Sequence, residues 1–352
     1  MRVTACVVSW NTADHLTGVL ESLAGQTGVD LEVVVVDNGS EDGSADVARR
    51  FEGVEVVANA INHGFAGAAN QGVDTARRNG SEAFLVCNPD VVVDPGYLER
   101  ATRALQVDGR RGAVQGKLWR WAEADGAGEP TARILDTTGH LAFRTRLFRN
   151  RGEGQPDRGQ FDREGPVFGV SGALALYRMT ALDDIACAGE VFDEDLFAFW
   201  EDVDLDWRMA LRGWGVWYEP RATAWHERGG AGPRRSALVE RLNFRNRFLV
   251  VLKNDTPAAL AKALPGVALT SVLKAGELAV TVPDAFLRSA ADRRLIGPTL
   301  ARRRIVQARA TVDPASVVTR WFAPFDYPAW ARTWWRRTRG RPIAEPVVTA
   351  RP

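Results

Sequence analysis

The sequence predicts an α/β fold, with a mostly parallel sheet flanked by helices and a helical C-terminal extension. Three observations support this prediction. Short β-branched apolar runs alternate with segments of helical periodicity over residues 1–110. Polar residues follow these runs directly, as they do where the strands of a parallel sheet end at a binding edge. Beyond Pro233 the pattern becomes helical and rich in arginine.

The first four strands are predicted from apolar runs at residues 3–10, 31–37, 54–58 and 82–88. Between the first two, leucine and valine recur at helical spacing, and Thr12 is the predicted N-cap of that helix. Helices are also expected after the second strand, after the loop of residues 59–72, and over residues 95–105, where a proline opens the first turn.

The pattern breaks between Trp119 and Gly165, which we interpret as a loop-rich excursion with a short hairpin at residues 134–143. Regular structure returns at residues 167–178, followed by an acidic helix and by strand-like runs at residues 215–220 and 222–227. No internal repeat is found.

Cysteine usage and the N-terminus indicate a reducing compartment. The three cysteines, Cys6, Cys87 and Cys187, are far apart and form no C-x-x-C pair, so we expect buried thiols. The chain enters its first strand without an apolar stretch and cleavage site, and we therefore expect no signal peptide.

Charge is distributed unevenly along the chain. The net charge is +1, but residues 286–352 contain 14 arginines and four acidic residues, interleaved with tryptophan, phenylalanine and tyrosine. Arginine with aromatic residues is typical of an anchor on an anionic membrane surface, and it also suits a packed helical cap. Because the preceding residues are net acidic, nucleic acid is not the expected partner. The longest apolar stretch, residues 263–273, is too short to span a bilayer.

Polar residues at the predicted carboxyl ends of four strands are candidates for ligand binding. Asn11 follows the first strand, Asp37 ends the second, and Asn88 and Asp90 follow the fourth. Each has a purely structural alternative: Asp37, for example, can form an Asx turn with Ser40. The loop after the third strand contains small residues that either approach phosphates at a helix N-terminus or pack closely on the sheet. Its spacing matches neither a P-loop nor the dinucleotide fingerprint.

A second set of candidates involves carboxylates and a histidine. Asp90 in "CNPD" offers one carboxylate to a divalent ion, which suffices where substrate phosphates and waters complete the coordination. His226 follows a predicted strand and could join it, although a lone histidine is more often a packing residue.

The segment "FWEDVDLDWRM" at residues 199–209 crowds four carboxylates among aromatic side chains. Asp204 and Arg208 are spaced i,i+4 and are expected to pair, and Asp206 is expected to be solvated or to pair with an arginine. Glu201 and Asp202 lie in the predicted first helical turn, where the helix dipole favours negative charge. The neighbouring aromatic residues add a flat apolar face, which suits a general base next to a sugar.

Taken in order, these motifs resemble family 2 inverting glycosyltransferases of the GT-A (Rossmann-like) fold, in their bacterial rhamnosyltransferase-like branch. The resemblance runs from "VVSWN" through "VVVDNGS", "NHGFAGAANQG", "CNPD", "VSGALALYR" and "FWEDVDLDWRM" to "WYEPRATAWHERGG". It implies a GT-A domain over residues 1–250, with a nucleotide-sugar half at 1–118 and an acceptor and catalytic half at 166–250. Residues 251–352 would form the basic, aromatic helical extension.

The resemblance also implies roles for individual residues. Asp202 would be the general base, and Asp90 and His226 would bind Mg²⁺ or Mn²⁺, although "NPD" departs from the D-x-D that is frequent in the family. Gly172, Trp200 and Glu201 would shape the acceptor site. The nucleotide-sugar would be bound by Ser9, Asn11, Asp37, Asn62, Gly64, Phe65, Asn70 and Asn88.

The implied reaction moves a sugar from dTDP-L-rhamnose or a UDP-sugar to a hydroxyl of a glycan or polyprenyl-diphosphate-linked acceptor, in cell-envelope polysaccharide synthesis. It would take place in the cytoplasm or at the inner face of the cytoplasmic membrane. The alternative is a non-catalytic protein that binds carbohydrate or nucleotide-sugar. A nucleotidyltransferase or a dehydrogenase would need a glycine-rich loop after the first strand, and "SWNTADHL" is not one.

Overall fold

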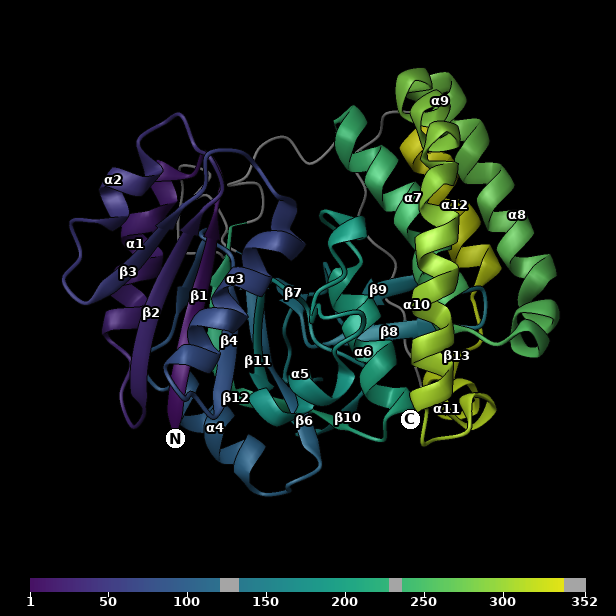
Figure 1. Cartoon of the computed structure of the whole chain (residues 1–352). Coiled ribbons are helices and arrows are strands. Elements are labelled where there is room, and N and C mark those ends of the chain that lie inside the picture. Colours follow the sequence, from purple (N-terminus) through teal and green to yellow (C-terminus); the bar gives the residue numbers. More distant parts are fainter. Residues whose placement is uncertain (121–132, 228–235, 339–352) are drawn as a thin grey trace.

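The computed structural model describes residues 1–120, 133–227 and 236–338 and is built around one large sheet with helices on both faces (Figure 1). The strand order is β10-β12-β6-β11-β4-β1-β2-β3, with β5 on β12 and β7 on β6. This confirms the predicted α/β fold. The strands are β1 (Arg2–Ser9), β2 (Asp30–Asp37), β3 (Val54–Ala58), β4 (Ala83–Cys87), β5 (Val91–Val93), β6 (Arg111–Arg120), β7 (Leu135–Thr137), β10 (Gly165–Val167), β11 (Leu174–Arg178) and β12 (Gly215–His226).

The N-terminal half of the sheet is parallel. Strands β4, β1, β2 and β3 run in one direction, with Ser9 opposite Asp37 and Asp37 opposite Ala58. Strand β11 lies antiparallel between β4 and β6. The loops that follow the parallel strands therefore lie at one edge of the sheet, as predicted.

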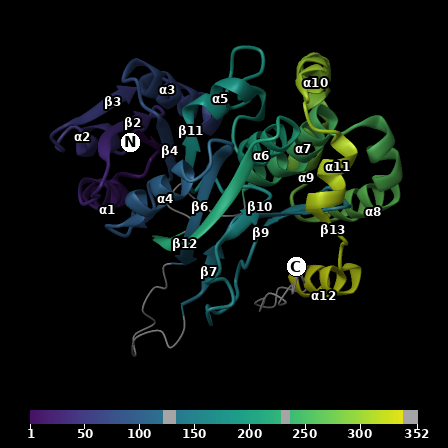
Figure 2. The same cartoon turned by 90° about the horizontal axis from the view of Figure 1, so that it is seen from below.

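Helices cover both faces of the sheet (Figure 2). One face packs against α1 (Ala13–Ala24), α2 (Ser44–Ala48) and α4 (Tyr97–Gln106); the other packs against α3 (Gly64–Arg78), α5 (Met179–Ile185) and α6 (Glu201–Leu211). Close packing explains one glycine, since a Cβ on Gly72 of α3 would lie 2.3 Å from the Cys6 sulfur. All three cysteines are buried and free, as predicted.

The predicted hairpin at residues 134–143 is wrong. Its two strands are present, but β7 pairs with β6, whereas β8 (His140–Phe143) pairs with β9 (Phe148–Asn150) and β13 (Phe322–Ala323) in a second, three-stranded sheet. Gly139, at φ 113°, lets the chain pass from one sheet to the other. The hairpin is therefore shifted along the chain to β8 and β9, whereas β7 and β8 also pair with strands more distant in sequence, β6 and β13, which a local pattern could not identify.

The C-terminal helices form a layer beside the sheet domain (Figure 1). They are α7 (Ala237–Asn254), α8 (Pro257–Thr281), α9 (Pro283–Ala291), α10 (Ile296–Arg309), α11 (Pro314–Trp321) and α12 (Tyr327–Thr338). A third core joins them to α6 and the second sheet through Trp207, Val250, Val306 and Phe322. Residue 250, the predicted domain boundary, lies inside α7, and the division there stays a prediction.

Helix α8 is longer than the sequence predicted. The eleven apolar residues lie inside a helix of 25 residues, because the lysines that bound them, Lys262 and Lys274, do not end it. Within the described residues, this helix alone is long and apolar enough to cross a membrane, judged by length and composition. Only 17% of its most apolar 18-residue window is buried in the protein.

Candidate active site

Asp37 lies at the carboxyl edge of the parallel strands, in a buried polar cluster. It is 3% exposed, and its Oδ2 accepts a hydrogen bond from the Ser40 amide, which forms the expected Asx turn. The other oxygen, Oδ1, is buried and has no hydrogen-bond partner among the described residues. A buried carboxylate oxygen without a partner costs free energy, so this atom is available to a ligand donor such as a ribose hydroxyl or base N–H.

Neighbouring side chains build the same edge. Asn62 Oδ1 accepts hydrogen bonds from Asn38 at 2.9 Å and from the Gly64 amide at 2.7 Å. Asn11 has a left-handed φ of 53°, and its Oδ1 accepts a hydrogen bond from the Glu41 amide. These contacts fix the loops of the edge, and the predicted contacts of Asn11 and Asn62 with a nucleotide stay predictions.

The prediction that Thr12 caps α1 is only partly right. Thr12 occupies the N-cap position of α1, but its side chain makes no capping hydrogen bond. Its hydroxyl instead lies 2.9 Å from the Ser9 hydroxyl, and both side chains are buried. Ser9 therefore supports the loop from inside the protein. Asn88 is placed by a backbone hydrogen bond from its amide to the Ala173 carbonyl.

Helix α3 links this edge to the segment of residues 190–197. Gly64 has a φ of 78°, and a Cβ there would lie 2.3 Å from the Phe197 carbonyl oxygen, so only glycine fits without a shift. Phe65 stacks edge-on against Phe192. The Asn70 side chain binds the Phe192 backbone at both its N–H and its carbonyl. Its observed contacts are therefore within the protein, and its predicted contact with the donor stays a prediction.

Asp90 and His226 are brought together, as predicted. Asp90 Oδ1 lies 3.2 Å from His226 Nε2, and Asp136, from β7, lies 2.8 Å from His226 Nδ1. Burial opposes the charge on His226, but hydrogen bonds and charges of Asp136 and Asp90 raise its pKa to about 9. Sequence reasoning missed Asp136, which lies in the excursion without periodicity.

These residues fit a divalent cation in their donor chemistry. Two ligands at right angles on an octahedral ion, each about 2.1 Å away, are about 3 Å apart, close to the separation of Asp90 and His226. Asp136 would orient the imidazole as a carboxylate does behind many metal-binding histidines. The described residues contain no group of three or more His, Cys, Asp or Glu that could hold a metal, so further ligands would have to come from substrate and water.

The carboxylate of Asp202, in the first turn of α6, is held by backbone hydrogen bonds at both oxygens. Its Oδ2 accepts a hydrogen bond from the Gly172 amide at 2.9 Å, and its Oδ1 accepts one from the Val203 amide at 2.7 Å. The side chain is 17% exposed. Gly172 thus holds the carboxylate through its backbone. A fixed, partly exposed carboxylate is what a general base requires.

The segment just before Asp202 has unusual backbone geometry. Phe197, Phe199 and Trp200 have φ angles of 65°, 66° and 74°, values that cost free energy in residues with a side chain. Asn246 of α7 compensates, because its amide nitrogen lies within 2.9 Å of the carbonyls of Leu196, Ala198 and Phe199. Such strain persists only where the surroundings impose it, which is typical of functional sites.

Trp200 and Glu201 flank Asp202. The Trp200 indole donates a hydrogen bond to Asn243 of α7 at 3.2 Å. Glu201 is buried and its Oε2 has no hydrogen-bond partner among the described residues. Burial and the neighbouring charge of Asp202 raise the pKa of Glu201 well above its ordinary value. The buried surroundings of Glu201 thus favour its neutral form.

The prediction that Asp206 is solvated or pairs with an arginine is wrong. Asp206 is fully buried and lies 2.7 Å from His140 Nδ1, on the second sheet. Its other oxygen accepts a hydrogen bond from the Val170 amide. The spacing of Asp202 and Asp206 is i,i+4, which places both on one helix face, but it does not indicate their partner on the second sheet.

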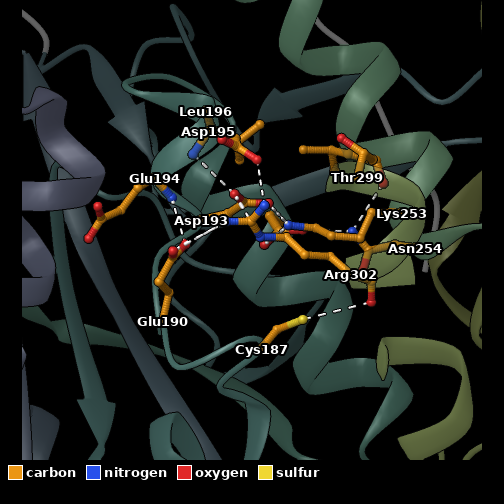
Figure 3. Close-up of polar contacts among 12 residues, drawn as sticks. Cys187, Glu190, Asp193, Glu194, Asp195, Leu196, Lys253, Asn254, Thr299 and Arg302 are labelled. Carbon is orange, nitrogen blue, oxygen red and sulfur yellow. Dashed lines mark hydrogen bonds and ion pairs between the residues drawn. The ribbon is translucent and has the colours of Figure 1, made fainter. Parts of the chain in front are cut away.

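A buried ionic cluster connects residues 190–204 to the C-terminal helices (Figure 3). Lys253 of α7 pairs with Asp193 and with Asp204, the latter at 2.9 Å. Arg302 of α10 pairs with Asp193, Asp195 and Glu190. Asp204 also pairs with Arg208 at 2.7 Å, which confirms the predicted i,i+4 pair. The cluster was not predicted, because Lys253 lies in an apolar run whose packing partner is remote in sequence.

Comparison with known proteins identifies the family. The model of glycosyl transferase family 2 matches residues 4–186, just over half of the chain. The chain belongs to this family. This family 2 glycosyltransferase is 29% identical over 235 residues to the N-acetylglucosaminyl-diphospho-decaprenol L-rhamnosyltransferase of Mycobacterium tuberculosis (strain CDC 1551 / Oshkosh), covering 63% of this chain and 74% of that protein. It is 22% identical over 231 residues to the poly-beta-1,6-N-acetyl-D-glucosamine synthase of Staphylococcus epidermidis, covering 63% of this chain and 49% of that protein.

Solved structures confirm the GT-A fold of this glycosyltransferase. S. aureus TarS 1-349 aligns with a TM-score of 0.51 at 17% identity, covering 88% of this chain and 83% of that one. GalNAc-T7, crystallised with UDP, GalNAc and Mn²⁺, aligns with a TM-score of 0.53 at 13% identity, covering 72% of this chain and 48% of that one. The family match confirms the predicted enzyme class, a glycosyltransferase.

Proposed function

We propose that this glycosyltransferase moves a sugar from a nucleoside diphosphate-sugar to an acceptor hydroxyl with inversion, and that Asp202 is the general base. The observation that supports this most strongly is the placement of Asp202. Its carboxylate is fixed by two amide hydrogen bonds, stays partly exposed, and follows an aromatic segment in strained geometry. Its neighbour Glu201 is buried in surroundings that favour the neutral form of that side chain.

The donor is dTDP-L-rhamnose or a UDP-sugar. The rhamnosyltransferase relative supports the first, and TarS 1-349 in complex with UDP-GlcNAc, which aligns with a TM-score of 0.51, supports the second. The free buried oxygen of Asp37 is the clearest protein acceptor for the nucleoside. Ser9, Asn11, Asn62, Gly64, Phe65, Asn70 and Asn88 form or support the rest of the pocket.

The chemistry is a single displacement. Asp202 takes the proton of the acceptor hydroxyl, whose oxygen forms a bond to the anomeric carbon. The bond from that carbon to the diphosphate oxygen breaks, and its electron pair leaves with the nucleoside diphosphate. One attack from the opposite face inverts the anomeric centre. A divalent cation, Mg²⁺ or Mn²⁺, held by Asp90 and His226, would neutralise the diphosphate.

The acceptor is a glycan or a polyprenyl-diphosphate-linked sugar of cell-envelope polysaccharide synthesis, bound near Gly172, Trp200 and Glu201. The name of the rhamnosyltransferase relative supports a lipid-linked acceptor. The enzyme would meet it at the cytoplasmic face of the membrane. Peripheral contact with anionic lipid is supported by the largely exposed apolar helix α8 and by the arginine-rich sequence that follows it.

The test measures donor binding and transfer separately. Thermal shift with UDP, dTDP, GDP and their sugars, with and without Mn²⁺, should find one nucleotide that stabilises the protein. Asp202→Asn should bind that donor as the wild type does and transfer at least about 100-fold more slowly. Asp183→Asn, which removes an exposed carboxylate that pairs with Arg77, is the matched control and should keep its activity. Full transfer by Asp202→Asn would refute the base assignment.

A further inference from the structure

His140 faces the proposed base from the second sheet. Its Nε2 lies 3.6 Å from Asp202 Oδ2, and its Nδ1 lies 2.7 Å from Asp206 Oδ2. The imidazole therefore stands between two carboxylates of one helix face. The distance to Asp202 is longer than a hydrogen bond but short for two charged groups in a buried site.

The backbone at Gly169 packs closely around His140 and Asp206. Both His140 and Asp206 are buried. A Cβ on Gly169 would lie 1.7 Å from Asp206 Oδ2, so that position admits only glycine without displacing the carboxylate. The His140 amide donates to the Gly169 carbonyl at 2.9 Å, which fixes the histidine backbone against the same turn.

We propose that the His140–Asp206 pair is a positioning unit for the general base, which keeps Asp202 ionised and directed toward the acceptor hydroxyl. The inference rests on the proposed function, because it requires Asp202 to be the base. His140 does not touch the substrate in this scheme, and its effect on the reaction passes through Asp202.

The proton inventory of the site supports the proposal. Burial raises the pKa of Asp206 to about 7 despite its hydrogen bond with His140. Burial disfavours charge on His140, but the facing charges of Asp202, Asp206 and Glu153 prevail and raise its pKa. The raised pKa of His140 favours the imidazolium, in which Nδ1–H donates to Asp206 and Nε2–H lies on the side facing Asp202.

The other titratable groups around the site are mainly acids. They are Glu153, Glu201, Asp206 and Tyr177, and the one cation among them, Arg208, pairs with Asp204. Without the histidine, Asp202 would stand beside two other carboxyl groups and would take up a proton more readily. A protonated Asp202 could not accept the proton of the acceptor hydroxyl, and transfer would stop.

The experiment compares a neutral and a cationic replacement. His140→Gln keeps an N–H donor of similar reach but loses the charge, whereas His140→Lys keeps a cation beside Asp206. The pH profile of kcat/KM should show its acid limb about one pH unit or more higher in His140→Gln, and near that of wild type in His140→Lys. An unshifted limb in His140→Gln, or equal shifts in both variants, would overturn the proposal.

Two further measurements separate the possible failures. Histidine-labelled wild-type protein, observed by NMR, should show a hydrogen on His140 Nε2 at pH 7, and an Nε2 without hydrogen would overturn the proposal even if both variants fail to fold. Asp202→Asn is assayed in parallel. If it transfers sugar normally, the base assignment itself fails; if it is inactive while the His140→Gln profile is unshifted, only the positioning role fails.

Discussion

Lys253 offers the clearest test of how the C-terminal helices hold the catalytic segment. The side chain is 1% exposed and pairs with Asp193, before the strained turn, and with Asp204, on α6. We consider Lys253→Met, which has similar length and no charge. The substitution leaves two buried carboxylates with one cation fewer between them.

The expected loss follows from the remaining contacts. Removing one partner of a buried ion pair costs about 3–5 kcal/mol because the other charge stays buried. Asp204 keeps Arg208, and Asp193 keeps Arg302 at 3.3 Å, so each carboxylate retains one guanidinium. We therefore expect Lys253→Met to lower the free energy of unfolding by about 3 kcal/mol, the lower end of that range. A unit of 150–250 residues would show a Tm lower by about 6–12 °C, and we expect the lower end or less, because the entropy of unfolding is larger for a chain of 352 residues.

The assay is urea unfolding followed by circular dichroism, with Arg288→Met as the control. Arg288 pairs with Asp284 at 2.8 Å, but the two side chains are 65% and 59% exposed, and the loss of this pair should cost less than about 1 kcal/mol. Equal losses in the two variants would refute the reasoning, since the Lys253 cluster would then behave like a solvated surface pair.

Three other outcomes are expected. Gly169→Ala should destabilise the protein by at least about 2 kcal/mol and lower transfer by displacing Asp206, whereas Gly172→Ala, whose Cβ would lie 3.5 Å from Asp202, should cost less than about 1 kcal/mol; equal effects would contradict the packing argument. In chelator-treated protein, the raised pKa of His226 stabilises the fold by about 3 kcal/mol below pH 6.5, and this stability is lost as the pH rises through 9. Urea unfolding across this range should show the loss in the wild type and not in His226→Gln. Anionic vesicles should retain the protein in flotation more strongly than neutral ones, and salt should weaken retention; no retention on either would rule out the proposed membrane contact.

The parallel part of the fold could be predicted from sequence because its signals are local. The apolar runs of β1, β2 and β4 are buried, and polar residues follow them at one edge. Residues Asp37, Asp90 and Asp202 follow strands or begin a helix, so their placement required no knowledge of distant partners. The same local reasoning identified the pair Asp204–Arg208, which a helix brings together by itself.

The residues that were missed meet their partners only through tertiary packing. His140 reaches Asp206 because β8 leaves the main sheet for a second one, a crossing that residues 134–143 do not signal. Asp136 reaches His226 because β7 pairs with β6. The expectation that Asp206 is solvated was also wrong. Its helix is acidic, and only the packing of the second sheet against that helix buries the side chain.

The contacts of residues 190–202 indicate that the C-terminal helices belong to the catalytic unit. At one end Asn70 binds the backbone of Phe192, next to the proposed donor edge. At the other end Asp202 begins α6. Between them, Asn246 and Lys253 of α7 and Arg302 of α10 hold the backbone and the acidic side chains. A strained turn keeps its geometry only while its surroundings impose it. We therefore expect the sheet domain, cut after residue 250, to lose the alignment of the base with the donor, because two of these three holding residues would be removed.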